Sequence, residues 1–176
     1  GAGYSLQIAG TRRPLLAFLG TSSNRVTVTR QGTTGEYSFA LGTVSCSLQV
    51  AFTDFRHMNS NGIDVRAAQI NTPSADFDNC SFSNLSGYAG PLLQLPNVAL
   101  GPIEDVRFFT SALPIPGTFF NVFRSAAGSG TVSFVNATGN LSGPIYDRET
   151  VGTTNPGNLI WNSTAVYWGN FASGTW

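Results

Sequence analysis

The chain has 176 residues, which is enough for one domain of ordinary size and short for two. Only 10% of the residues are charged, nine arginines balance nine acidic residues, and lysine is absent. A chain of zero net charge lacks the positive face of nucleic-acid-binding and polybasic membrane-binding proteins, and 41% hydrophobic residues exclude a disordered chain. We expect one all-β domain over 1–176, without a nucleic-acid partner.

Short alternating runs between glycine turns predict strands in the first part of the chain, and no segment shows the 3.6-residue apolar period of a helix. These runs are Tyr4–Ile8, Leu15–Leu19, Val26–Val28, Tyr37–Phe39 and Leu48–Val50. They are less evenly spaced than the later segments, so we expect 1–45 to form less regular coils and 46–161 regular ones. No apolar run approaches the roughly 18 residues of a membrane span.

A repeat becomes visible in the spacing of large apolar residues. Six similar segments end on residues that are 27, 27, 26, 26 and 27 positions apart. These residues are Val28, Phe55, Phe82, Phe108, Phe134 and Trp161. A second, mostly apolar column lies two positions earlier, and the residues between are mostly polar, which is the alternation of a strand. We expect the six residues to stack in one interior column.

Each repeat continues through a polar or glycine-containing turn into a second apolar run. These second runs are Ile63/Val65, Leu92–Leu95, Phe119–Phe123 and Ile145–Tyr146. A period of 26 to 27 residues with two or three strands is typical of one coil of a parallel β-solenoid, whereas propeller blades need about 40 to 50 residues. A β-sandwich is the alternative, but it does not require equivalent columns at constant spacing.

Several rung sequences are similar to one another: Phe77–Phe82, Val106–Phe108, Val132–Asn136, Val26–Thr29, Leu48–Val50 and Phe52–Phe55. They resemble the rungs of right-handed parallel β-helix proteins, the pectate-lyase-like superfold, and above all its repetitive exported bacterial members. The resemblance covers nearly the whole chain. With the six repeats, we expect a right-handed parallel β-helix of six or seven coils. Low charge without lysine also fits an exported protein, so we expect an extracellular or cell-surface location. The chain departs from enzymes of this class because it has no catalytic lysine, and it shows no N-terminal capping helix.

In such families asparagine side chains often stack at the turn after a strand. Asn84 and Asn136 hold matching places in this sequence, with Thr110 between them, so we expect an interrupted ladder. Cys80 falls at an interior position of the repeat, where a thiol packs like a small apolar group. Cys46 lies seven residues before the position one coil below Cys80, so we expect no disulfide.

One acidic cluster comprises Asp76, Asp78, Glu104 and Asp105. Asp78 and Glu104 occupy the same column one coil apart, so either one pKa rises or a cation such as Ca²⁺ lies between them. Catalysis on a polysaccharide is a further reading, with Arg107 as the base. The simplest alternative is a set of solvated turn carboxylates. Apart from this calcium site, no cofactor is expected.

Two further features are candidates for chemistry or assembly. His57 follows Asp54 by three residues and so faces the opposite side of a strand, which argues against a Ser/His/Asp triad with Ser81. The tail over 162–176 breaks the repeat, and we expect it to form a cap or a strand that pairs with another subunit. Its aromatic residues are candidate interaction residues: Tyr167, Trp168, Phe171 and Trp176.

Three functions follow from these observations. The favoured one is a non-enzymatic extracellular or surface module, either a self-assembling fibre subunit or a segment of a longer adhesin-like solenoid. The second is a carbohydrate-binding module that stacks sugars on exposed aromatic residues. Candidates for that stacking are Tyr88, Phe109, Tyr146 and Trp168. The third is a polysaccharide lyase or hydrolase centred on the acidic cluster.

Overall fold

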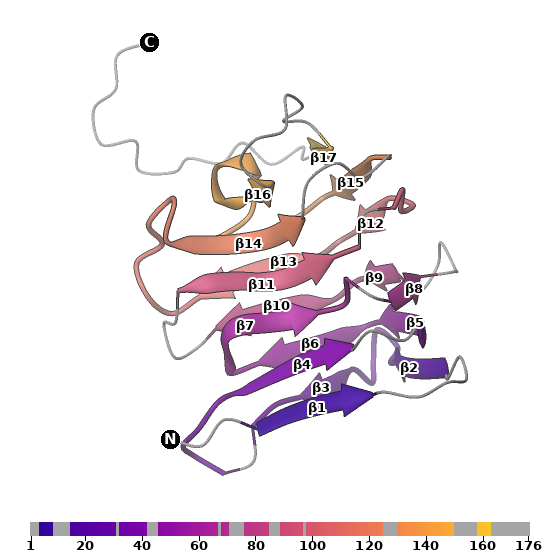
Figure 1. The fold of residues 1–176 in the computed structure, drawn as a ribbon, viewed down its shortest axis with the longest axis vertical. Coiled ribbons are helices and arrows are strands. Elements are labelled where there is room, and N and C mark those ends of the chain that lie inside the picture. Colours follow the sequence, from indigo (N-terminus) through magenta and orange to yellow (C-terminus); the bar gives the residue numbers. More distant parts are fainter. Residues whose placement is uncertain are drawn as a thin grey trace.

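The computed structural model describes residues 4–8, 15–30, 32–41, 46–66, 68–70, 76–84, 89–96, 98–124, 130–149 and 158–162. For residues 4–8, 68–70 and 76 only the backbone is described. Strands dominate this part of the chain, and every ladder between two strands is parallel. Figure 1 shows these strands stacked turn upon turn from the N-terminus upward.

The strands fall on three faces that the chain visits in order. The first two turns are β1 (Tyr4–Ile8), β2 (Leu15–Leu19), β3 (Val26–Val28), then β4 (Tyr37–Leu41), β5 (Cys46–Ala51), β6 (Thr53–Arg56). The next two are β7 (Met58–Asp64), β8 (Ala68–Ile70), β9 (Asp76–Asp78), β10 (Ser81–Asn84), then β11 (Gly90–Leu95), β12 (Ile103–Glu104), β13 (Arg107–Thr110). Above them lie β14 (Phe119–Arg124), β15 (Val132–Val135), the 3-10 turn η1 (Pro144–Tyr146), β16 (Arg148–Glu149) and β17 (Leu159–Asn162).

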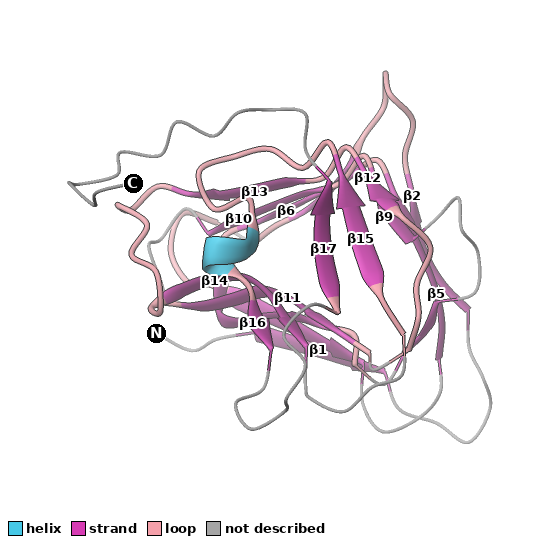
Figure 2. Cartoon of the chain, turned by 90° about the horizontal axis from the view of Figure 1, so that it is seen from above, coloured by secondary structure: helices cyan, strands magenta, loops and turns pink. Residues whose placement is uncertain are grey.

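We call the three faces the front, side and rear sheets. The front sheet has the order β1-β4-β7-β11-β14-β16, and the rear sheet has the order β3-β6-β10-β13. The side sheet consists of the ladders β2-β5-β8 and β12-β15-β17, with β9 also paired to β5. Figure 2 shows the three faces from above, enclosing the interior.

The prediction of an all-β parallel solenoid is therefore confirmed, with about four turns instead of the six or seven expected. In Figure 1 the front strands point to the right, the fainter rear strands lie behind them, and the chain climbs upward, so the winding is right-handed. The sandwich alternative is wrong, because sandwiches are built from antiparallel sheets. The run Ile145–Tyr146 lies in η1 and not in a strand. No helix in the described part of the chain could cross a membrane.

The core contains a stack of phenylalanine rings under the rear sheet. Phe55 pairs with Phe82 and Phe82 with Phe108, and all three are buried. The ring centroids lie 5.2 and 5.5 Å apart with interplanar angles of 9° and 17°. Val28 continues this column below Phe55. One large apolar residue per turn therefore fills the space between the three sheets, as the spacing predicts for the lower turns.

A single residue makes the corner between the side and rear sheets in successive turns. Phe52, Asn79, Asp105 and Asn136 have φ of 48°, 54°, 54° and 55°, in the left-handed region. The backbone N–H groups of the first three donate to the carbonyl that precedes the corner of the next turn, as in Asn79 N–H to Glu104 O at 2.8 Å, and Asn136 N–H donates to Asn162 O at 3.1 Å. Asn and Asp tolerate this conformation better than other residues with a side chain. The expected match of Asn84 with Thr110 is confirmed, but the match with Asn136 is wrong, because Asn136 stands at the corner.

The rear sheet ends at β13, where the expected six-residue column is also wrong. Phe134 pairs with Ile103 in the side sheet instead of with Phe108, and Trp161 pairs with Phe134. The segment 136–143 covers the edge of β13: Thr138 bridges Arg107. The side chain of Asn140 accepts from Thr110 N–H at 2.9 Å and donates to Thr110 O at 2.8 Å. A side-chain amide here takes the place of the next strand.

Candidate binding face on the rear sheet

A cluster of charges around Asp54 lies on the outer face of the rear sheet. Asp54 Oδ1 accepts from Arg25 Nε at 3.0 Å and Nη2 at 2.7 Å, and from the Ser81 hydroxyl at 2.7 Å. Its Oδ2 accepts from Arg56 Nη2 at 3.2 Å. Burial alone would raise the pKa of Asp54, but the hydrogen bonds from Arg25 and Ser81 and the charges of both arginines hold the pKa below its usual value. Asp54 therefore stays ionised and fixes its partners.

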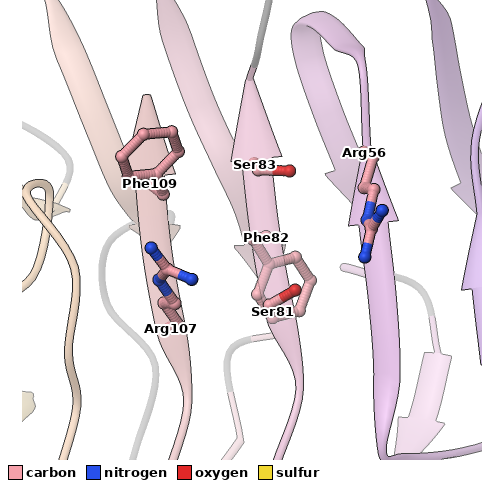
Figure 3. Close-up of a pocket in the computed structure, with 6 residues that line it drawn as sticks. All are labelled: Arg56, Ser81, Phe82, Ser83, Arg107 and Phe109. Carbon is pink, nitrogen blue, oxygen red and sulfur yellow. The ribbon is translucent and has the colours of Figure 1, made fainter. Parts of the chain in front are cut away.

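A depression of about 220 Å³ opens beside this cluster. Its lining is Arg56, Ser81, Phe82, Ser83, Arg107 and Phe109. These residues come from β6, β10 and β13, three neighbouring strands of the rear sheet (Figure 3). The parallel register aligns Ser81 with Arg107, and it aligns Ser83 with both Arg56 and Phe109. Residues two apart on a strand face the same side, so the alternation that buries Phe82 and Phe108 directs the other lining side chains outward.

The two arginines of the depression are held in different ways. The Arg56 side chain is 49% exposed and has one ion-pair contact, to Asp54. The guanidinium of Arg107 lies over the ring of Phe109, 5.2 Å from the centroid. A cation over an aromatic face is attracted by the ring quadrupole, so Phe109 orients Arg107 without neutralising it.

Both serine hydroxyls of the depression already donate their protons to acceptors within the protein. Ser81 donates to Asp54, and Ser83 donates to Phe55 O at 3.2 Å. A hydroxyl that donates inward still carries lone pairs, so both oxygens remain acceptors for a ligand. The site therefore combines two cationic groups with two hydroxyl acceptors and an aromatic ring.

The acidic cluster lies at the neighbouring corner. Asp78 and Glu104 hold equivalent positions just before the corners at Asn79 and Asp105, as the repeat predicts. Asp78 Oδ1 accepts from the Glu104 N–H at 2.8 Å. Burial raises the pKa of Asp78, the backbone hydrogen bond opposes this, and the charge of Asp105 adds to the rise. The Asp78 carboxylate therefore accepts the hydrogen bond of a backbone N–H in the next turn, which explains its position.

The calcium hypothesis receives no geometric support from these contacts and stays a prediction. Among the residues whose side chains are described, no three acidic, histidine or cysteine side chains gather closely enough to hold a metal ion. The side chain of Asp76 lies outside the described residues. Arg107, the expected catalytic base, belongs to the depression and stacks on Phe109.

Other candidates from the sequence fall elsewhere. Tyr146 packs against the core. Asp54 bonds to arginines and Ser81 and not to His57, as the argument against a triad predicts. The Nδ1 of His57 is buried and has no hydrogen-bond partner within the described part of the chain. Both cysteines are buried and unpaired, as expected. The remaining aromatic candidates lie outside the described residues: Tyr88, Tyr167, Trp168, Phe171 and Trp176.

No protein-family model matches the chain, and neither a curated protein nor a solved structure matches it at a significant level. The rear-sheet depression was not predicted from the sequence. A signal for it exists: Asp54, Ser81 and Arg107 stand at the same outward position of successive repeats. The outward positions two residues later in the same three repeats are occupied by Arg56, Ser83 and Phe109.

Proposed function

We propose that the chain is a non-enzymatic structural module of an extracellular or cell-surface solenoid, and that it associates with a second copy of itself through its first turn. We also propose that it belongs with the exported, pectate-lyase-like type of β-helix. The right-handed winding and the low charge without lysine support this assignment. The observation that carries the proposal is that apolar core residues are less buried at the first turn than one turn above.

The apolar interior is less covered at the first turn than one turn above. Leu16 and Phe18 of β2 are only partly buried, whereas their register partners Leu48 and Val50 are each 1% exposed. Val28 of β3 is likewise partly buried below the fully covered Phe55. Removing apolar surface from water is the main favourable term in association, so another turn below β2 and β3 would stabilise this end.

The backbone at this end also offers hydrogen-bonding groups. Val26 N–H donates upward to Phe52 O at 3.1 Å, and Gly20 N–H donates upward to Ala51 O at 3.0 Å. Successive N–H groups of a strand alternate in direction, so those of Thr27 and Leu19 face away from the described turns. Edges with unpaired backbone groups template further strand pairing. A second copy that adds strands here would satisfy both the apolar and the polar groups.

The test is the mass in solution as a function of concentration. Sedimentation equilibrium is expected to show masses above the 18.6 kDa of one chain that rise with concentration. Thr27→Pro removes an N–H on the open side and no upward hydrogen bond, so it should move association to at least tenfold higher concentration. Thr27→Ala keeps the N–H and is the matched control, expected to behave like the wild type.

Two results would contradict the proposal. A single-chain mass up to the solubility limit would exclude self-association. Turnover of any member of a polysaccharide panel, abolished by Asp78→Ala, would exclude the non-enzymatic assignment and favour the lyase or hydrolase hypothesis.

A further inference from the structure

The rear-sheet depression carries more positive charge than its own residues neutralise. Asp54 is its neighbouring acid, and Arg25 takes one of the two oxygens of that carboxylate with two donors. Arg25 Nη2 also donates to the backbone carbonyl of Asn79 at 2.7 Å. Arg56 gives Asp54 one N–H, and Arg107 has the ring of Phe109 as its contact within the described part of the chain. Two guanidinium groups therefore keep donors for a ligand.

The positions of these groups restrict the shape of the ligand. Arg56 and Arg107 belong to β6 and β13, with β10 between them, so they are two strand spacings or about 10 Å apart along the stack. Figure 3 shows their guanidinium groups on opposite sides of the strand that carries Ser81 and Ser83. A sulfate or phosphate ester offers three terminal oxygens to donors on both sides of it, whereas a planar carboxylate offers two.

The remaining lining indicates what carries the anion. The hydroxyl oxygens of Ser81 and Ser83 can only accept from a ligand, because their protons are donated to the protein. The volume of about 220 Å³ is several times the roughly 30 Å³ that one water occupies, so a bare ion leaves most of the space to solvent. A ligand with hydroxyl donors beside its anionic group uses both features.

From this geometry we propose that the depression binds the sulfate or phosphate ester of a sugar. The ester group lies between Arg56 and Arg107, and the sugar hydroxyls donate to Ser81 and Ser83. Phe109 supports Arg107 and offers an apolar edge to the ring of the sugar. This site is independent of the proposed association through the first turn, since it lies on the outer face of β6, β10 and β13.

Calorimetric titration at fixed ionic strength tests the proposal with three probes on one backbone and with inorganic sulfate. The three are a sulfated dextran oligosaccharide, the unsulfated oligosaccharide and its carboxylated form. The sulfated oligosaccharide is expected to bind at least tenfold more tightly than each of the others. Equal binding of inorganic sulfate would mean a simple anion site, and equal binding of the carboxylated form would remove the tetrahedral preference. Either result, or absence of binding by every probe, overturns the proposal.

Matched variants locate the site. Arg107→Gln removes one charged donor and should weaken binding of the sulfated oligosaccharide about tenfold or more. Arg148→Gln is the control, because Arg148 lies over the ring of Phe120 at the same 5.2 Å but on the front sheet. It changes the net charge equally and should leave the affinity unchanged. Equal weakening by both variants would show non-specific attraction and would contradict the proposed site.

Phe109→Leu tests the orientation of Arg107 while the charge stays in place. Loss of the ring should weaken binding several-fold, less than loss of the guanidinium itself. Thermal unfolding of each variant controls for folding. An affinity unchanged by Phe109→Leu would contradict the role of the ring in placing Arg107.

Discussion

The large apolar residues of the interior pack differently in the lower turns of the solenoid, β1 to β13, and in the upper turns, β14 to β17. In the lower turns Val28, Phe55, Phe82 and Phe108 follow one another in strict register under the rear sheet. In the upper turns Phe134 stands over Ile103 of the side sheet, although it follows Phe108 by the same 26 residues that separate Phe108 from Phe82. Equal spacing in the sequence therefore does not ensure equal register in the fold.

The difference originates at the segment that covers β13. A Cβ at position 139 would lie 1.9 Å from Phe108 O, so Gly139 permits a close approach of this segment that a side chain would prevent. Leu141 N–H donates to Phe108 O, and Asn140 satisfies both backbone groups of Thr110. The aromatic interior continues above this point, because the rings of Phe134 and Trp161 stack at 4.4 Å. The hydrogen bonds of this segment therefore occupy the edge of β13, where a strand carrying Phe134 would otherwise pair.

The largest expected difference between the two regions is the cost of removing an aromatic ring. Phe82 is fully buried between Phe55 and Phe108, so Phe82→Ala should lower the free energy of unfolding by about 3–5 kcal/mol. Trp161 is only partly buried, so Trp161→Ala should lower it by about 2 kcal/mol. Denaturant unfolding monitored by circular dichroism measures both values.

Phe82→Leu is the control for this comparison, since it keeps most of the apolar volume and should cost less than about 2 kcal/mol. An equal loss in Phe82→Ala and Trp161→Ala would show that the upper turns are as tightly coupled to the core as the lower ones. That result would contradict a difference in packing between the lower and the upper turns.

The second difference concerns pH. Burial raises the pKa of Asp147 to about 6, the Trp161 hydrogen bond opposes the rise, and the charge of Glu149 adds to it. The pKa in the unfolded chain is about 4, so folding takes up a proton between pH 4 and 6. The free energy of unfolding then falls as pH rises through this window, by about 1–2 kcal/mol after allowance for exposure. In the lower turns Asp54 has a lowered pKa and gives the opposite slope.

Asp147→Asn isolates this contribution because the amide keeps an acceptor for Trp161 and does not titrate. We expect the variant to be more stable than the wild type at pH 7 and equal to it at pH 4, as measured by denaturant unfolding at each pH. A stability difference that is independent of pH would exclude Asp147 as the titrating group.

The sequence alone predicts much of the lower turns. The strands at Tyr4–Ile8, Leu15–Leu19 and Val26–Val28 are confirmed with the same bounds. The buried positions of Phe82 and Cys80 also follow from the alternation, because a repeat with constant register places each side chain inside or outside. The alternation can be read from a few neighbouring residues, and in a regular stack it is sufficient to predict which side chains are buried.

The upper turns and the rear-sheet depression needed contacts between distant residues. Asn140 belongs to a turn-forming sequence, and nothing local indicates that its amide replaces a strand beside Thr110. Arg25 reaches Asp54 across 29 positions, and its place just before β3 marks it only as a polar residue. Charge pairing across turns depends on side-chain geometry that periodicity does not specify.

The smallest effect tests what the two regions share. The corner has nearly the same left-handed φ at Asn79 in the lower turns, 54°, and at Asn136 in the upper turns, 55°. Alanine disfavours this conformation, whereas glycine adopts it freely. Asn79→Ala and Asn136→Ala should therefore each be about 1 kcal/mol less stable than the glycine variant at the same position, measured by denaturant unfolding. If the alanine–glycine difference vanishes at Asn136 but not at Asn79, the corner does not persist above β13, and the shift of Phe134 would begin at the corner itself and not at the residues that follow it, 137–143.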